Sequence, residues 1–344
     1  MKNKKTFSGR KVLFAGVVIV GIIIAAIMVL STVFFYRLMK QSDELLVGSG
    51  AKSYDGYYVL VTEEADTDFW KSILKGAKDK AEEDNIYLQI QQQELSEPLT
   101  KQQQMEMAIH SGVDGILLDG GDSSALAKLV DQATAAGIPV VTVYHDCPPS
   151  TRISYVSVSG TNMGRDYGQQ ICELVKNRED NGEKTDVSVL LDASDSTGAQ
   201  TILLTGMKEE IEERGFGDRV EIETALIHSG TMFSAQEEIR GLFAERKPAD
   251  IFVCLDELST VCVSQLVVDY NLVGNAQILG FYISDAINSA LAKQIISATI
   301  TADTYQMGRD GVEALTEYRQ SGYVSDYYAA EISVVTSPQK GGDR

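Results

Sequence analysis

The chain has 344 residues, of which 30 are basic and 49 acidic, and its formal net charge is −19. Seven basic residues and no acidic ones lie in residues 1–40, so the remainder carries a net charge of −26. An acidic surface of this size repels nucleic-acid phosphates and anionic lipids, which argues against a nucleic-acid-binding function.

The first predicted element is an uncharged apolar run, residues 12–36, which is long enough to cross a bilayer as a helix of roughly 20 residues. Basic residues precede it, and the positive-inside bias therefore makes residues 1–11 a cytoplasmic tail. We expect a single-pass protein of the cell membrane, with a linker over 37–56 and an extracellular or periplasmic domain. A cleaved secretory signal is the alternative, although its apolar region is usually only about 7–15 residues long.

Beyond the linker, apolar strand patterns alternate with amphipathic helix patterns. Strands that alternate with helices of about 10–15 residues are typical of parallel sheets with helices on both faces. The alternation fills two halves of similar size, and about 290 residues exceed one typical core, so we predict an α/β fold with two Rossmann-like lobes. The predicted strands are 57–62, 86–90, 115–118, 139–144, 155–158, 187–191, 220–227, 251–255, 277–281 and 297–301, and the predicted helices are 69–84, 98–111, 123–136, 163–176, 201–214, 234–245 and 259–270.

Ligands of such sheets bind beyond the carboxyl ends of the strands. The side chains at these ends are carboxylates and aromatics with one histidine, and we find no Lys or Arg among them. Carboxylates accept hydrogen bonds from hydroxyl groups and aromatic faces pack on ring-shaped ligands, a combination that favours a neutral polyol such as a sugar, or a cation. The alternative is that several of these acids cap helices. The strand-end residues are Glu63, Glu64, Asp66, Asp68, Phe69, Trp70, Asp119, Tyr144, His145, Asp146, Asp192, Asp195, Asp256, Glu257, Tyr282, Asp285 and Asp303.

Four stretches resemble the ribose- and galactose-type periplasmic sugar-binding proteins, the type 1 solute-binding proteins of ABC transporters. They are residues 59–83 (VLVTEEADTDFWKSILKGAKDKAEE), 111–130 (SGVDGILLDGGDSSALAKLV), 137–146 (GIPVVTVYHD) and 299–315 (TITADTYQMGRDGVEAL). This family is related to the effector domains of LacI-type repressors. No helix-turn-helix precedes the matches, because the apolar segment occupies that place, so a repressor is not expected.

The resemblance implies two lobes that are joined by three crossovers, with a ligand bound between them that favours the closed form. The implied first lobe is 57–159 plus 303–329, the implied second lobe is 160–302 plus 330–336, and residues 337–344 are expected to be a disordered tail.

The resemblance also implies binding residues. Phe69 and Trp70 match the paired aromatics that sandwich the sugar ring, and Asp256 matches a family acid. The chain departs from the family elsewhere: Tyr144 and His145 replace Asp-Arg, Thr201 replaces Arg, Leu255 replaces Asn, Tyr282 replaces Asp and Ala302 replaces Gln. We therefore expect a sugar or a sugar-like, modified, larger or less polar ligand. The expected ligand-binding residues are Glu63, Asp66, Phe69, Trp70, Tyr144, His145, Thr201, Asp256, Tyr282 and Asp303.

Three function classes remain. The first is a solute-binding protein that delivers its ligand to an ABC permease. The second is a sensing subunit that signals to a membrane histidine kinase or chemoreceptor, which an uncleaved anchor favours. The third, an enzyme, is not expected, because no nucleophile–base pair or phosphate loop is found.

No cofactor and no metal are expected either. The four cysteines lack the spacing of a zinc site and are too few for a disulfide scaffold. Buried thiols are the simpler expectation, and a disulfide between Cys254 and Cys262 is the alternative.

Overall fold

The structure is a computed structural model that describes residues 53–90, 99–176, 178, 183–193, 198–228, 232–244 and 248–337. The predicted cytoplasmic tail, the predicted membrane helix and most of the linker therefore lie outside the described residues, as does most of the predicted C-terminal tail. Within the described ranges, no helix is both long and apolar enough to cross a bilayer.

Strands and helices alternate along the described part of the chain, as the sequence predicts. The strands are β1 (Gly56–Val61), β2 (Ile86–Ile90), β3 (Gly115–Leu118), β4 (Val140–Val143), β5 (Ser154–Val158), β6 (Thr185–Asp192), β7 (Val220–Ile227), β8 (Ile251–Cys254), β9 (Gln277–Phe281), β10 (Ala298–Ala302), β11 (Tyr327–Ala330) and β12 (Ile332–Thr336). The helices are α2 (Asp68–Glu83), α3 (Lys101–Ser111), α4 (Ser124–Ala135), α5 (Gly160–Lys176), α6 (Ala199–Glu213), the 3-10 helix η1 (Gly217–Arg219), α7 (Met232–Ala244), α8 (Glu257–Asp269), α9 (Asp285–Ala292) and α10 (Thr304–Ser321). The sequence patterns did not predict α9, β11 or β12.

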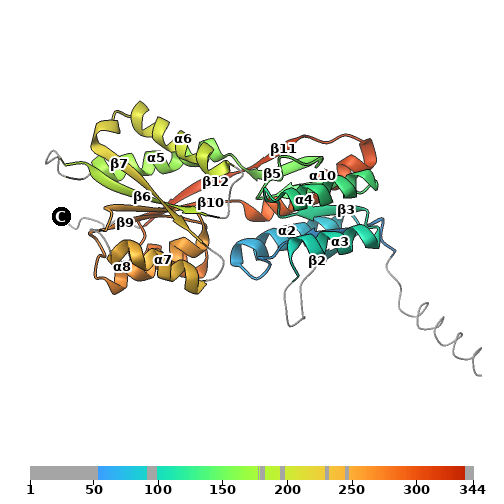
Figure 1. The fold of residues 1–344 in the computed structure, drawn as a ribbon, viewed down its shortest axis with the longest axis horizontal. Helices are drawn as coiled ribbons and strands as arrows, with labels where there is room; N and C mark the ends of the chain where they lie inside the picture. Colours follow the sequence, from blue (N-terminus) through green and yellow to red (C-terminus); the bar gives the residue numbers. More distant parts are fainter. Residues whose placement is uncertain are drawn as a thin grey trace, which may run out of the picture. The chain divides into compact units, whose positions relative to one another are not determined.

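These strands form two sheets of six strands with equivalent strand orders (Figure 1). The sheet of the first lobe has the order β11-β5-β4-β3-β1-β2, and that of the second lobe has the order β12-β10-β9-β8-β6-β7. All pairings are parallel except that of β12 with β10. The predicted two-lobed α/β fold with parallel sheets is confirmed.

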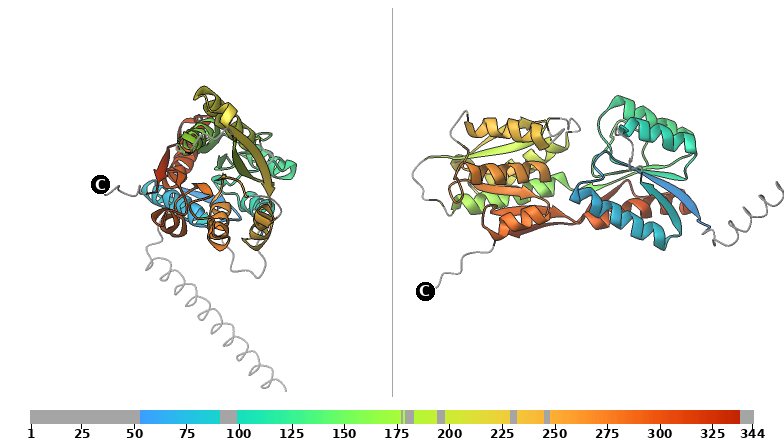
Figure 2. Two further views of the ribbon diagram at one scale, coloured as in Figure 1. Left: turned by 90° about the vertical axis from the view of Figure 1, so that its left-hand side faces the viewer. Right: turned by 90° about the horizontal axis from the view of Figure 1, so that it is seen from below.

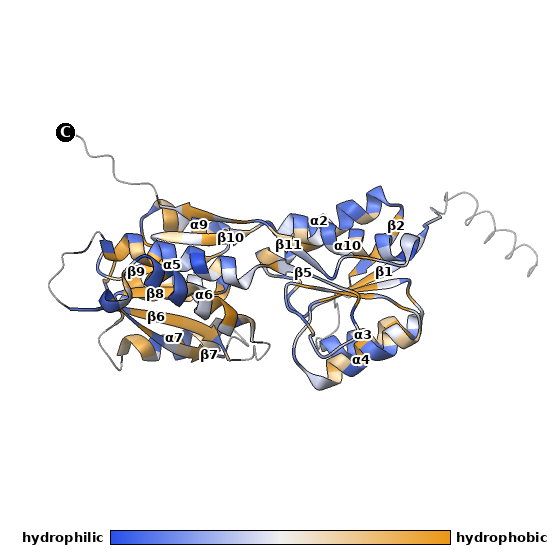
Figure 3. Ribbon diagram, turned by 90° about the horizontal axis from the view of Figure 1, so that it is seen from above, coloured by the Kyte–Doolittle hydropathy of each residue, from blue (hydrophilic) through white to orange (hydrophobic). Residues whose placement is uncertain are grey.

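Side chains that alternate along each strand form separate cores on the two faces of a sheet. In β1, Tyr58 and Leu60 pack into the core beneath α2 and α10, whereas Val59 and Val61 pack beneath α3 and α4. The helices of the first lobe accordingly lie on both faces of its sheet (Figure 2), and its strand β1 is strongly hydrophobic (Figure 3). Strands that are buried on both faces need continuous apolar runs, which explains their sequence.

The two lobes repeat one helix-packing motif. The tetrapeptide Met-Gly-Arg-Asp occurs in α5 at 163–166 and in α10 at 307–310. A Cβ atom on Gly164 would lie 2.1 Å from the carbonyl oxygen of Leu203 in α6, and one on Gly308 would lie 2.0 Å from that of Ile73 in α2. Only glycine permits these close helix contacts.

The chain passes between the lobes at three points, after β5, after β10 and between β11 and β12. The second and third of these segments are hydrogen-bonded to each other, since the Asp303 N–H donates to the Glu331 carbonyl at 2.9 Å. Strand β11 reaches Ala330 in the first sheet, one residue beyond the predicted end of that lobe. All four cysteines are buried and none of them forms a disulfide, so the alternative disulfide between Cys254 and Cys262 is not formed.

Candidate ligand-binding site

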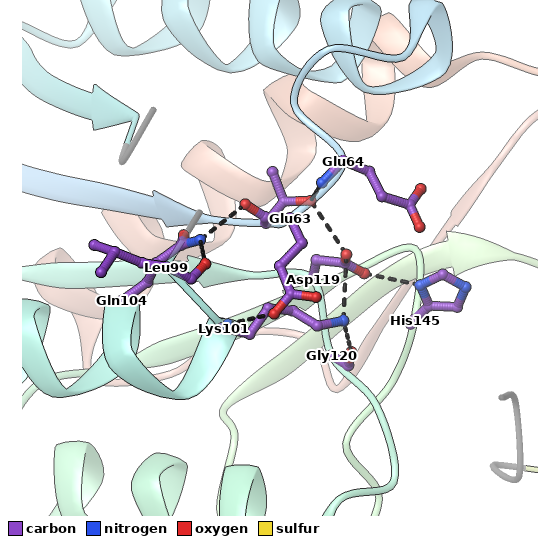
Figure 4. Close-up of polar contacts among 9 residues, drawn as sticks. Glu63, Glu64, Leu99, Lys101, Gln104, Asp119, Gly120 and His145 are labelled. Carbon is purple, nitrogen blue, oxygen red and sulfur yellow. Dashed lines mark hydrogen bonds and ion pairs between the residues drawn. The ribbon is translucent and has the colours of Figure 1, made fainter. Parts of the chain in front are cut away.

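A buried carboxylate lies at the carboxyl ends of the first-lobe strands. Asp119 directly follows β3, and only 2% of its side chain is exposed. Its Oδ2 accepts hydrogen bonds from Thr62 Oγ1 at 3.2 Å and Lys101 Nζ at 3.4 Å, and its Oδ1 lies 2.8 Å from His145 Nδ1 (Figure 4). Burial alone would raise the pKa of Asp119, but Lys101 and His145 lower it below its ordinary value. Asp119 is therefore a carboxylate held between an ammonium group and an imidazole.

Lys101 corrects the prediction that no Lys or Arg lies at these strand ends. It is the first residue of α3, and its Nζ also donates to the Gly120 carbonyl at 2.9 Å. A helix that follows a strand of a parallel sheet begins at the carboxyl edge of that sheet. Thr100 caps α3, and this cap is the sequence signal that places Lys101 at the edge.

Two glutamates from the turn after β1 lie beside this network. Glu63 Oε1 accepts a hydrogen bond from the Lys101 backbone N–H at 2.6 Å, which joins the β1 turn to the start of α3. The Glu64 side chain lies at the surface, but the neighbouring protein removes part of the hydration of its carboxylate. This desolvation and the charge of Asp119 raise the pKa of Glu64.

His145 follows β4 and lies beside Asp119. Burial alone would lower the pKa of its imidazole, but the Asp119 carboxylate raises it above the ordinary value. The ring also packs on Tyr144, with 4.4 Å between the ring centroids. The position of the imidazole is therefore set by one charged hydrogen bond and one aromatic contact.

An aromatic cluster, defined as Phe69, Tyr144, Phe281 and Tyr282, combines residues of both lobes. The ring centroid of Phe69 lies 4.5 Å from that of Tyr144, 5.8 Å from that of Phe281 and 5.2 Å from that of Tyr282. Phe69 is only 5% exposed as a result. The Tyr282 hydroxyl also donates to the Asp68 carbonyl at 3.1 Å.

Asp256 is a carboxylate of the second lobe whose charge acts on Tyr144 of this cluster, and it also caps α8. Its Oδ1 accepts from the Ser259 backbone N–H at 2.7 Å and its Oδ2 from Ser259 Oγ at 2.8 Å. Burial, with a contribution from Asp192, nevertheless raises the pKa of Asp256. Burial, with the charges of Asp256 and Glu64, also raises the pKa of Tyr144. Carboxylates of both lobes therefore act on one tyrosine hydroxyl.

The structure places the other expected residues elsewhere. Trp70 is fully buried in the core of the first lobe, and its Nε1 has no hydrogen-bond partner within the described part of the chain. The side chains of Asp66 and Thr201 are exposed, and so is Asp303, which caps α10 by accepting from the Gln306 N–H at 2.8 Å. Contacts thus join Phe69, Tyr144, His145 and Tyr282. Trp70 meets the edge of the Phe69 ring from the core, whereas the exposed side chains of Asp66, Thr201 and Asp303 are not part of this group. Their predicted ligand contacts stay predictions.

No cluster of three or more His, Cys, Asp or Glu residues suited to a metal ion occurs in the ranges that the structure describes. The arrangement instead offers hydrogen-bond acceptors, one imidazole and aromatic faces.

Comparison with known proteins gives one family match. The profile described as "Periplasmic binding protein domain" matches residues 57–322. No curated protein matches the chain.

Several solved structures are similar in fold. GanP, a glucose-galactose binding protein from Geobacillus stearothermophilus, is 22% identical with a TM-score of 0.71 and covers 84% of this chain and 100% of its own. A solute-binding protein from Burkholderia graminis in complex with D-arabinose is 16% identical with a TM-score of 0.71, over 82% of this chain and 96% of its own. The XylFII-LytSN complex contains a chain that is 19% identical with a TM-score of 0.69, and the match covers 83% of this chain and 99% of that one. Identities this low indicate a shared fold.

Proposed function

Because the chain belongs to the periplasmic binding protein domain family, we propose that it is a membrane-anchored extracytoplasmic receptor for a sugar or sugar-like molecule. The ligand is bound between the two lobes and passed to an ABC-type permease. The aromatic cluster carries this proposal, because Phe69 of the first lobe packs on Phe281 and Tyr282 of the second beside acidic strand ends. The names of several structures similar in fold, which include glucose-galactose and D-arabinose binding, support a sugar as the ligand class.

The chemistry of the site suits hydroxyl groups. Burial raises the pKa of Asp256 and, with the charge of Asp119, that of Glu64, so neither carboxylate has a fully compensating partner. A ligand hydroxyl that donates to either one provides a charge-assisted hydrogen bond. The apolar face of a sugar ring replaces an aromatic neighbour of Phe69, so that aromatic packing is exchanged for ligand packing. This chemistry is binding without turnover, and the bound sugar should be recovered unchanged.

A thermal-shift screen of the full-length chain in detergent tests this proposal. The panel contains D-glucose, D-galactose, D-arabinose, D-xylose, D-tagatose and D-ribose. A sugar that binds only the folded state raises the melting temperature with concentration, and at 100 times Kd it stabilises by about 2.7 kcal/mol. No shift with any sugar contradicts the proposal.

A matched pair of variants locates the binding site. Asp256→Asn keeps a capping side chain but removes the charge, and we expect it to reduce the shift strongly. Glu221→Gln removes an exposed charge at the start of β7, the opposite end of the second sheet, and should leave the shift unchanged. If both variants reduce the thermal shift equally, the result counts against a ligand site at the carboxyl ends of the strands.

The anchor is the second part of the proposal. Its support is the uncharged run of residues 12–36 with basic residues before it. N-terminal sequencing of the mature protein from the membrane fraction tests it. Retention of the first residues is expected, and a chain that begins after about residue 40 contradicts the anchor.

A sensing subunit is the alternative function, and one observation favours it. One structure similar in fold is the XylFII-LytSN complex, in which such a chain is bound to a second protein. Deletion of this protein separates the two functions. Loss of uptake of the cognate sugar indicates transport, whereas normal uptake with loss of a sugar-dependent transcriptional response indicates sensing through a membrane histidine kinase or chemoreceptor.

A further inference from the structure

The network of Lys101, Asp119 and His145 has no role in the proposed packing of the sugar ring. His145 is the most exposed member of the network, with about 33% of its side chain exposed against 23% for Lys101, whereas Asp119 is buried. The network therefore links a buried charge to an imidazole that reaches the surface.

The orientation of the imidazole follows from its contact with Asp119. The Nδ1 atom faces Asp119 Oδ1 at 2.8 Å, and Figure 4 shows the other ring nitrogen on the side away from this carboxylate. Asp119 accepts hydrogen bonds only, so Nδ1 carries a proton in both the neutral and the charged imidazole. Nε2 is then the only ring nitrogen whose protonation state changes, and it becomes a hydrogen-bond donor when it is protonated.

The backbone around His145 is held in place. Its N–H donates to the Val143 carbonyl at 3.0 Å, and its carbonyl accepts from the Gly120 N–H at 3.1 Å. A Cβ atom on Gly120 would lie 2.4 Å from that carbonyl oxygen, so the two turns approach as closely as glycine permits. The orientation of the imidazole ring is therefore fixed by its hydrogen bond with Asp119 and its contact with Tyr144.

The charges that face His145 come from three neighbouring elements and from its own turn. Asp119 after β3 and Glu64 after β1 are negative, and Lys101 of α3 is positive. Asp146 follows in the same turn and forms an ion pair with Arg152. Lys101 directs its ammonium to Asp119 and the Gly120 carbonyl. An imidazolium at His145 is therefore the cationic donor next to carboxylates that can only accept.

We propose that protonated His145 donates a hydrogen bond from Nε2 to the ligand, and that Asp119 and Lys101 are positioning residues that hold the ring for this contact. The inference rests on the proposed function, because it concerns the same site. The ligand presents an oxygen acceptor here, such as a hydroxyl or ring oxygen. An ammonium group on the ligand would meet a positive charge, so of the two ligand classes that the sequence leaves open, His145 selects the neutral polyol.

Nitrogen-15 NMR of the histidine-labelled full-length chain in detergent tests the positioning role without a ligand. The chain has three histidines, and His145→Gln assigns the signal. Asp119→Asn should lower the pKa of His145 because it removes the opposite charge, whereas Lys101→Met should raise it because it removes a like charge. Thermal unfolding of each variant confirms that it is folded. Shifts in the same direction, or no shifts, overturn the positioning role.

The ligand contact is tested by the pH dependence of affinity for D-galactose, or for the panel sugar with the largest thermal shift. Wild-type affinity should fall about tenfold or more as the pH rises through the pKa of His145, the loss expected for one charged hydrogen bond. His145→Gln should bind weakly at all pH values, and His145→Arg should bind without this pH dependence. Wild-type affinity that is independent of pH and unchanged in His145→Gln overturns the inference. Absence of binding by every sugar contradicts the proposed function instead, while the NMR shifts still decide the positioning role.

Discussion

Tyr144 and Tyr282 occupy equivalent positions in the two lobes and share a left-handed backbone conformation, with φ of 68° and 71°. Tyr144 follows β4 and Tyr282 follows β9, which are equivalent strands in the two sheet orders. Each N–H donates to the neighbouring strand, to Val156 at 2.9 Å and to Ile300 at 2.7 Å. Both rings pack on Phe69. The same strained turn therefore delivers one tyrosine from each lobe to the aromatic cluster.

This strain predicts that glycine is more stable than alanine at both tyrosine positions, which is the reverse of the usual order within a strand. At both tyrosines the Ala variant should be less stable than the Gly variant by about 1 kcal/mol, because an L-residue is penalised at positive φ and glycine is not. Urea unfolding of the four variants measures the difference. Tyr155 in strand β5 is the control, where Ala should be the more stable by about 0.5–1 kcal/mol. The same order at all three positions would contradict strain at the turns.

The close helix contacts predict a second contrast. Gly308→Ala and Gly164→Ala should each cost about 1–3 kcal/mol, because the new methyl group meets a backbone carbonyl that cannot move without displacing a helix. Gly241 lies in α7, and no atom of the described residues comes within 4 Å of the position that its Cβ would take. Gly241→Ala should therefore be stabilising by up to about 1 kcal/mol. Chemical denaturation measures all three, and a loss of stability in Gly241→Ala comparable to the others would remove the steric explanation.

The single tryptophan predicts a spectroscopic result. Trp70 is 0% exposed, so iodide should quench its fluorescence weakly, and Trp70→Ala should cost about 3–5 kcal/mol from lost packing. Trp70→Phe should cost less, because it retains an aromatic ring. A ligand that moves Phe69 should change the emission, since the two rings meet edge to face at 6.3 Å. Strong iodide quenching in the folded protein would contradict this burial.

The pair of His145 and Asp119 predicts a pH dependence of stability. The folded state raises the pKa of His145 above the ordinary value of 6.5. The contribution of this pair to stability is therefore fully present below about pH 6.5 and is lost as the pH rises through the raised pKa. The pKa of Asp119 is lowered, so its contribution is lost only as the pH falls below about 3.8. Urea unfolding should show His145→Gln most destabilised near pH 6 and closer to the wild type near pH 9.

A double-mutant cycle provides the control for this pH dependence. In the Asp119→Asn background, His145→Gln should no longer change the slope of stability with pH, because the partner charge is absent. An unchanged slope difference in that background would assign the effect to another group.

The helix and strand patterns predicted most of the fold because they depend on local periodicity. Strands such as β1 and β3 are buried on both faces, so their apolar runs are visible in the sequence. The short strands β11 and β12 follow no such run, because each is stabilised by pairing with a distant strand, β11 with β5 and β12 with β10. The patterns of residues 57–62 and 277–281 therefore identified strands, whereas the pattern of residues 327–336 did not identify β11 and β12.

The sequence by itself determined the alternation of elements, the acidic and aromatic character of the strand ends and the apolar run of residues 12–36. The tertiary structure decided which of these side chains meet. Phe69 contacts Tyr282, 213 positions away, only because the two lobes bring their strand ends together. Lys101 reaches Asp119 because α3 begins at the edge where β3 ends. Such contacts depend on sheet order and on the geometry of turns, and neither can be read from the periodicity of one chain.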